Sequence, residues 1–195
     1  MKGSKSKTAG TADQGGKALT VSQPDVLIDG SDATFRLVVH DLLALSSRLH
    51  DINAGFARIV GVSPVQYTIL ATIFEQQDIG AVTVGKVAEH IHLSGSFVTI
   101  ETGKLVKKGL VDKTADADDR RRVNLRTTAK ADRRFRFLNQ FQCPVNNAAF
   151  DGITRAEFLS LRDIVAKILP ETDRALSLQG ELFPLAETLD AAQAA

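Results

Sequence analysis

Apolar residues recur along one face of the segment between residues 35 and 59. Their intervals alternate between three and four: Phe35, Val38, Leu42, Leu45, Leu49, Ile52, Phe56 and Ile59. Strict heptad spacing is typical of a helix that packs along a narrow seam against a partner helix. The alternative is an ordinary amphipathic helix whose apolar face packs on the core. Val39 and Leu43, however, already add a second apolar edge that can pack on the core. We therefore predict a helix–helix dimer contact, with Asp32 as the cap of this helix.

Three further segments of helical periodicity follow, each preceded by a residue that can cap a helix. These residues are Ser63, Thr83 and Ser94, whose side-chain oxygens can accept hydrogen bonds from the first free backbone N–H groups. Gly109 is placed to end the third helix. The second and third segments are short and joined by a tight turn, which predicts a helix-turn-helix.

A β-hairpin is predicted directly after these helices. Residues 109–113 and 123–127 alternate between apolar and polar positions, as half-buried strands do. The stretch between them, TADADDRRR (114–122), sets three acidic residues against three arginines. Such a run is usually a solvated, self-neutralising loop, so its meaning depends on what flanks it. A small strand is also predicted at residues 79–82.

Two more helices are predicted in the C-terminal part of the chain. One begins at Thr128, and the other follows Thr154, because Thr154 and Glu157 have the spacing of a capping box. The inward-facing residues of the first are expected to be Phe135, Leu138 and Phe141.

Charge is unevenly distributed along the 195-residue chain. The whole chain has a net charge of +1, yet between Lys113 and Arg136 nine basic residues face four acidic ones, a net +5. A basic segment on a nearly neutral protein most often binds nucleic acid.

Several classes of protein are disfavoured. The single cysteine, Cys143, permits neither an intrachain disulfide nor a cysteine-based zinc site. No apolar run approaches the roughly 18 residues that span a bilayer, and no apolar segment follows the N-terminal lysines, so a cytoplasmic protein is expected. The sequence has no phosphate-binding loop, nucleophile motif or metal-ligand pair, so we expect neither an enzyme nor a cofactor.

The order of these elements resembles one family of known proteins. Residues 82–131, VTVGKVAEHIHLSGSFVTIETGKLVKKGLVDKTADADDRRRVNLRTTAKA, are similar to the winged helix of the MarR family of bacterial transcription regulators. The most specific match is the hairpin tip with its Asp-Arg-Arg run, followed by Val123-x-Leu125 and by Thr128. The resemblance implies a mainly α fold with a small β-hairpin, in which dimerisation helices flank a winged helix-turn-helix.

This resemblance divides the chain into five parts. The first and last parts, which lack strong periodicity, are predicted to be tails, and the first of them to be disordered. The expected parts are an N-terminal tail (1–31), an N-terminal dimerisation helix (32–62), a winged helix-turn-helix (63–127), C-terminal dimerisation helices (128–179) and a C-terminal tail (180–195).

The family also gives the charged hairpin tip a role. Such a wing inserts an arginine into the DNA minor groove, where the negative potential is enhanced, and an aspartate two residues earlier holds that arginine. Asp119 and Arg121 match the pair, since a carboxylate can hold a guanidinium with two hydrogen bonds. Arg120 and Arg122 are then expected to contact phosphates.

The helix after Ser94 is expected to lie in the major groove. Val98, Thr102 and Leu105 share the face that should point toward the core. The residues expected to contact DNA are Ser94, Ser96, Thr99, Ile100, Lys104 and Lys107. Ile100 stands where relatives often have a basic residue, which argues against an arginine that reads guanine. Glu101, next to the core face, is expected to need a cationic or hydrogen-bonding partner.

The resemblance further implies a homodimer that releases double-stranded DNA, at a pseudo-palindromic operator, when a small effector binds. Arg36 and His40, one turn apart, are candidates to hold an effector carboxylate, and Tyr67 to supply a polar ring edge. The family's range suggests aromatic acids or their thioesters. For Arg36 and His40 the alternative is an ordinary surface position.

Other functions remain as alternatives. A winged-helix module that binds protein but no DNA is the main one, although such a module has no need of three consecutive arginines at a hairpin tip. Metal sensing by histidines is disfavoured, because His90 and His92 are only two residues apart. Cys143, beside Pro144, is expected to be an inert thiol and not a redox switch.

Overall fold

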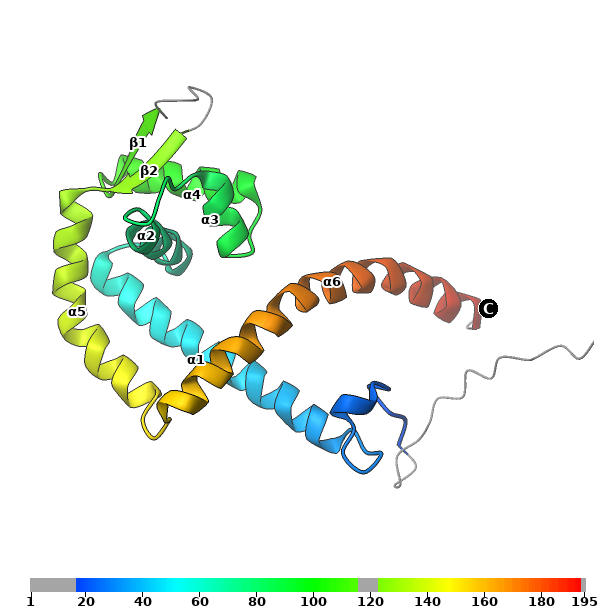
Figure 1. Cartoon of the computed structure of the whole chain (residues 1–195). Helices are drawn as coiled ribbons and strands as arrows, with labels where there is room; N and C mark the ends of the chain where they lie inside the picture. The colour runs from blue at the N-terminus through cyan, green and yellow to red at the C-terminus, as the bar shows by residue number, and fades with distance from the viewer. Residues whose placement is uncertain (1–16, 116–122, 194–195) are drawn as a thin grey trace, which may run out of the picture. The chain divides into compact units, whose positions relative to one another are not determined.

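The computed structural model of the chain describes residues 17–115 and 123–193 (Figure 1). The described chain is mainly helical with one two-stranded antiparallel sheet, so the predicted fold class is confirmed. Two compact units divide the chain, one ending at Gln142 and the other beginning at Cys143. In order, the elements are η1 (Pro24–Val26), α1 (Ala33–Val60), α2 (Pro64–Gln76), α3 (Val84–His90), α4 (Gly95–Lys107), β1 (Val111–Ala115), β2 (Val123–Thr127), α5 (Ala129–Ala149) and α6 (Arg155–Gln193).

Local capping chemistry sets the starts of α2, α3 and α4, as predicted. Ser63 Oγ accepts the backbone N–H of Gln66 at 3.3 Å, and Gln66 Oε1 accepts that of Ser63 at 3.4 Å, which completes a capping box. The hydroxyls of Thr83 and Ser94 each accept a backbone N–H three residues further on, at 3.3 Å. After α4, Gly109 adopts a φ of +66°, which favours glycine and ends the helix.

The core of the first unit collects apolar side chains from every helix of the helix-turn-helix and from the hairpin. It includes the end of α1 and the first half of α5. Its largest fully buried side chains are Ile69, Leu70, Ile73, Leu105, Leu110, Leu125, Leu138, Val60, Val82, Val87, Val98 and Val111. The prediction that Phe141 faces inward is wrong: α5 leaves this core after Leu138, and the exposed Phe141 ring instead contacts Phe137 of its own helix at 5.4 Å.

The hairpin pairs β1 with β2 in antiparallel register, from Val111 opposite Thr127 to Ala115 opposite Val123. The small strand predicted at residues 79–82 does not form. Only the hydrogen bond from Leu125 N to Val82 O, 2.8 Å long, continues the sheet, and Ile79 is 87% exposed. The side chain of Gln77 holds the far end of β2 in place. Its Oε1 accepts the backbone N–H of Thr127 at 2.9 Å, and its Nε2 donates to the hydroxyl of Thr127 at 2.9 Å.

Three cationic side chains meet at the C-terminal ends of α1 and α4. Lys108 Nζ donates to Gly61 O at 3.1 Å, and Lys130 Nζ donates to Lys108 O at 2.7 Å. Arg134 donates to Val60 O. These carbonyls have no partner within their helices, and positive charge is favourable at the negative end of the helix dipole. The junction, defined by Lys108, Lys130 and Arg134, therefore ties α1, α4 and α5 together.

The prediction of a disordered tail over residues 1–31 is wrong for residues 17–31. They form η1 and an isolated bridge between Ile28 and Ser31. Asp32, expected to cap α1, makes no side-chain capping bond. Its buried carboxylate instead accepts the backbone N–H and hydroxyl of Thr20, at 2.7 and 2.6 Å, and pairs with Arg36. These bonds lower the pKa of Asp32.

The second unit differs from prediction at its end. The capping box at the start of α6 is confirmed, since Glu157 accepts the N–H of Thr154 at 2.8 Å and its hydroxyl at 2.6 Å. The helix then continues to Gln193 through Pro170 and Pro184, whereas a tail was predicted from residue 180. The tail was inferred from weak periodicity, but this stretch is rich in alanine, leucine and glutamate, which favour helix whatever their spacing.

The seam predicted along α1 is largely exposed on the single chain. Phe56 is buried, but the seam residues exposed along the helix are Val38, Leu42, Leu45, Leu49 and Ile59. A row of exposed apolar side chains on one helix is typical of an interaction surface. No single described helix is both long and apolar enough to cross a membrane. Helices α1 and α2 meet the length and composition criteria only when taken together, and the chain bends by 80° between them.

Candidate nucleic-acid interface

Helix α4 has one buried face and one exposed face. Val98, Thr102 and Leu105 are fully buried, as predicted, and anchor the helix on the core. All six residues of this region predicted to contact DNA are exposed: Ser94, Ser96, Thr99, Ile100, Lys104 and Lys107. The fold therefore gathers them on one surface, named here the α4 face, and their role as DNA contacts stays a prediction.

Glu101 finds both kinds of partner that its position requires. Its side chain is 5% exposed; Oε2 accepts Gln66 Nε2 at 2.8 Å and Oε1 accepts Lys104 Nζ at 2.6 Å. The hydrogen bonds from Lys104 and Gln66 lower the pKa of Glu101. Because Gln66 also belongs to the capping box of α2, a continuous polar network fixes α4 against the start of α2.

A prediction follows for the pH dependence of stability. Because the folded protein lowers the pKa of Glu101, the stability that this carboxylate contributes is present above its unfolded-state pKa and is lost as the pH falls. Glu101→Gln should therefore be less stable than the wild type at pH 7, and the difference should shrink at pH 4. Urea unfolding at both values measures this. The exposed Glu89→Gln on α3 is the control, and an equal deficit of Glu101→Gln at both pH values would contradict the prediction.

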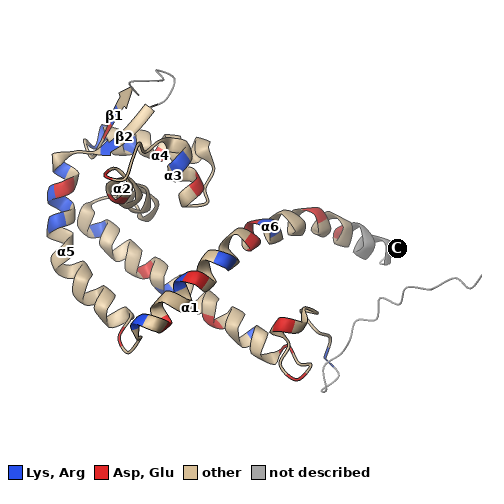
Figure 2. Cartoon of the chain, viewed as in Figure 1, with Lys and Arg blue, Asp and Glu red and all other residues tan. Residues whose placement is uncertain are grey.

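The wing residues predicted to contact DNA lie outside the described residues. These are Asp119, Arg120, Arg121 and Arg122. The two strands that lead to them are described, and their exposed side chains include Lys113 and Arg126. In Figure 2, further Lys and Arg positions are marked in blue on the ribbon along the first half of α5.

Sequence reasoning missed Phe97. This side chain lies in the first turn of α4 and is 40% exposed. It is three residues before Ile100, so the two are neighbours on the helix surface. The sequence did contain an indication of this exposed ring. Phe97 lies in the first turn of the helix and does not share the seven-residue spacing of the buried Val98 and Leu105.

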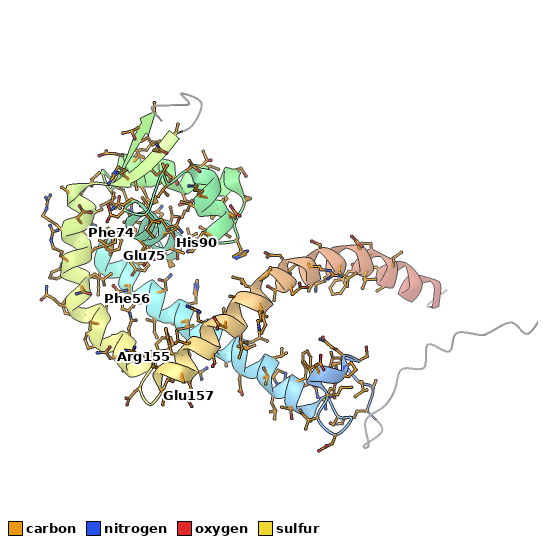
Figure 3. The ribbon with its side chains drawn as sticks, in the orientation of Figure 1. Phe56, Phe74, Glu75, His90, Arg155 and Glu157 are labelled. Carbon is orange, nitrogen blue, oxygen red and sulfur yellow. The ribbon has the colours of Figure 1, made fainter. Side chains whose placement is uncertain are left out.

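A second candidate site is a cavity of about 470 Å³ between α2 and α5. Its lining residues are Tyr67, Ala71, Phe74, Glu75, Phe135, Arg136, Asn139 and Gln142. The rings of Phe74 and Phe135 lie 4.6 Å apart, and the hydroxyl of Tyr67 accepts Gln142 Nε2 at 3.3 Å. Burial raises the pKa of Tyr67. Figure 3 labels Phe74 and Glu75 on α2 and Phe56 on α1, whose ring also packs near Tyr67.

The three predicted effector residues do not meet within one chain. Tyr67 lines the cavity, but Arg36 pairs with Asp32, and His40 is exposed. At 1.5 Å per residue, Arg36 lies roughly 30 Å along α1 from Phe56. The other lining residues were missed, although on each helix three of the four lining residues follow intervals of four and three, which mark one face.

Metal and thiol chemistry gain no support from the described part of the chain. Across residues 17–115 and 123–193, no group of three or more His, Cys, Asp or Glu side chains is placed to hold a metal ion. The thiol of Cys143 is exposed and lies 3.8 Å from Asn147 Nδ2.

The helix-turn-helix, the α4 face and the adjoining hairpin define a winged helix-turn-helix protein. The sequence comparison agrees, because a model described as MarR family matches residues 60–122. The HTH-type transcriptional repressor MdtR of Bacillus subtilis (strain 168) is 27% identical over 121 residues, 61% of this chain and 76% of that protein. Over its winged helix the chain is therefore similar to the MarR family of transcription regulators.

Solved structures share the fold. A putative MarR family regulator from Listeria monocytogenes, complexed with 26mer DNA, aligns with a TM-score of 0.61 at 20% identity, over 72% of this chain and 93% of that one. The S. aureus MepR–DNA complex aligns with a TM-score of 0.55 at 15% identity, over 77% of this chain and 99% of that one. At these identities the likeness establishes the fold alone.

Proposed function

We propose that this protein is a homodimeric repressor that binds double-stranded DNA and releases it when a small effector binds. The main support for this proposal is the α4 face. Its three hydroxyl side chains, two lysines and one isoleucine are suited to contact DNA, and they lie on one surface of a helix whose other face is buried. Two observations on relatives support it. MdtR is described as a repressor, and two proteins of the same fold were solved with DNA.

The dimer is proposed from the exposed seam of α1. Val38, Leu42, Leu45 and Leu49 would leave an apolar stripe in water on an isolated chain. A second copy of the same helix is the simplest cover, because twofold symmetry makes such a seam self-complementary. A twofold dimer would read a pseudo-palindromic operator whose half-sites are about 10 bp apart. In this proposal residues 32–62 and the helices from residue 128 onward dimerise, and residues 63–127 bind DNA.

The cavity between α2 and α5 is the proposed effector site. Tyr67, Phe74 and Phe135 supply aromatic walls, and Arg136 at its edge supplies a cation for an acidic group. An effector that changes the position of α2 would also displace Gln66 and its bond to Glu101 on α4. Arg36 and His40 stay predictions as effector ligands, since they would have to come from the second copy.

Selection of DNA fragments by the purified protein, followed by sequencing, tests the proposed function. Enrichment of one pseudo-palindromic sequence is expected, protected over both half-sites in footprinting. Absence of any enriched sequence would favour a protein-binding winged helix instead.

The wing supplies a second prediction, which concerns Asp119 and Arg121. Arg121→Ala should weaken operator binding, and Asp119→Ala should weaken it too, although the second change removes a negative charge that would repel DNA. If Asp119 holds Arg121, its loss should cost on the order of 1 kcal/mol, and the two losses should be non-additive in a double-mutant cycle at fixed salt. Tighter binding by Asp119→Ala would mean that the acidic residues only form a solvated loop.

A further inference from the structure

The centre of the α4 face is apolar. Ile100 is 58% exposed and Phe97 is 40% exposed, and the methyl-bearing Thr99 lies between them in the sequence and is exposed. Gly103, one turn after Thr99, leaves open space, because a Cβ added there would meet no atom within 4 Å. Together these residues form a shallow apolar surface in the first turns of the helix, which is the part of a recognition helix that contacts base edges.

Several polar groups beside this surface already have partners inside the protein. Thr99 Oγ1 donates to Gly95 O at 2.7 Å, and Lys104 Nζ donates to Glu101 Oε1 at 2.6 Å. Ser94 Oγ accepts Phe97 N at 3.3 Å and lies 3.3 Å from Ser96 Oγ. The helix sequence, GSFVTIETGKLVK, contains no Arg, Asn or Gln. It therefore lacks the arginine that pairs with guanine and the asparagine or glutamine that pairs with adenine. Lysine can also contact guanine, but Lys104 is bonded to Glu101 and Lys107 lies in the last turn of the helix.

We propose that Ile100 and Phe97 read thymine methyl groups in the major groove, with Ile100 as the main determinant of specificity. Thymine is the base that presents a methyl group there, and apolar side chains recognise it by contact. The inference rests on the proposed DNA binding and adds the kind of base that each half-site must contain. The ammonium group of Lys107, beyond the apolar surface, would then contact a phosphate.

Uracil substitution isolates the methyl group, because uracil keeps every hydrogen-bonding group of thymine. Each thymine of the selected operator is replaced by uracil, one position at a time, and affinity is measured at fixed salt. At one or two positions in each half-site, the substitution should lower the affinity of the protein for the operator on the order of four-fold, which is the effect of one buried methyl group. Thymines outside the half-sites should tolerate the change.

The same duplexes with Ile100→Ala connect the methyl group to its reader. The variant should bind the thymine operator more weakly than the wild type does. At one position, however, replacing thymine with uracil should cost it little further affinity (the uracil penalty), because residue and methyl group act through a single contact. Phe97→Ala should do the same at a neighbouring position. Ile79→Ala, which removes a more exposed isoleucine from outside α4, is the control and should keep the full penalty.

The outcomes separate this inference from the proposed function. If an operator is enriched and bound but no uracil weakens binding, the methyl-reading proposal is overturned while the function stands. The proposal is equally overturned if the penalty persists in both Ile100→Ala and Phe97→Ala. If no DNA sequence is enriched at all, both fail.

Discussion

Replacing Leu45 with glutamate should convert the protein from a dimer into a monomer. Leu45 lies in the middle of the α1 seam and is 46% exposed on the single chain, so the proposed partner helix would bury it. Each dimer would then bury two carboxylates in an apolar seam, at a cost of several kcal/mol. Operator affinity should fall by roughly 100-fold or more, because the second half-site loses its tethered partner. Sedimentation equilibrium and operator binding measure the two effects.

Leu43→Glu is the matched control for this experiment. Leu43 is 64% exposed on the same helix, two residues away, and at 100° per residue it lies on a different side from the seam. Its substitution should leave the dimer intact. A Leu45→Glu protein that stays dimeric, or a Leu43→Glu protein that dissociates equally, would show that the seam is not the dimer contact.

The second large effect is expected for Leu105→Ala. Leu105 is fully buried under α4, and truncation of a buried leucine to alanine costs about 2–5 kcal/mol, since it loses apolar burial and leaves a cavity. Because Leu105 anchors the α4 face, DNA binding should also weaken. Urea unfolding measures the first effect and operator binding the second.

Ile100→Ala separates stability from recognition on the same helix. Ile100 is exposed, so its truncation should change the free energy of unfolding by less than about 0.5 kcal/mol, while operator binding weakens. Equal losses of stability in the two variants would contradict the assignment of a buried and an exposed face to α4.

The sequence predicted the features of this fold that depend on neighbouring residues. Ser63, Thr83 and Ser94 cap their helices with side chains only three residues from the N–H groups they accept. The glycine stop at Gly109 and the two strands of the hairpin are equally local, although β1 begins at Val111 and not at Gly109 as predicted. The α4 face was predicted as well, because helical periodicity and the buried triplet determine which side of the helix remains exposed.

Features that depend on distant residues were missed. Asp32 bonds Thr20, twelve residues earlier, in place of the helix N-terminus, and no periodicity indicates such a pairing. The cavity joins Tyr67 to Gln142 across two helices, so its walls become evident only once α2 and α5 pack. Glu101 is intermediate: its need for a partner was predicted, but Gln66 could not be identified from the sequence.

The junction of Lys108, Lys130 and Arg134 bears on how salt should affect DNA binding. Lys130 and Arg134 belong to the segment whose nine basic residues give it a net charge of +5, yet both donate to backbone carbonyls within the protein. Only cations that neutralise phosphates release counterions from DNA. A count of lysines and arginines therefore overstates the number of phosphates this protein can engage, and the ionic-strength dependence of its affinity should be correspondingly shallow.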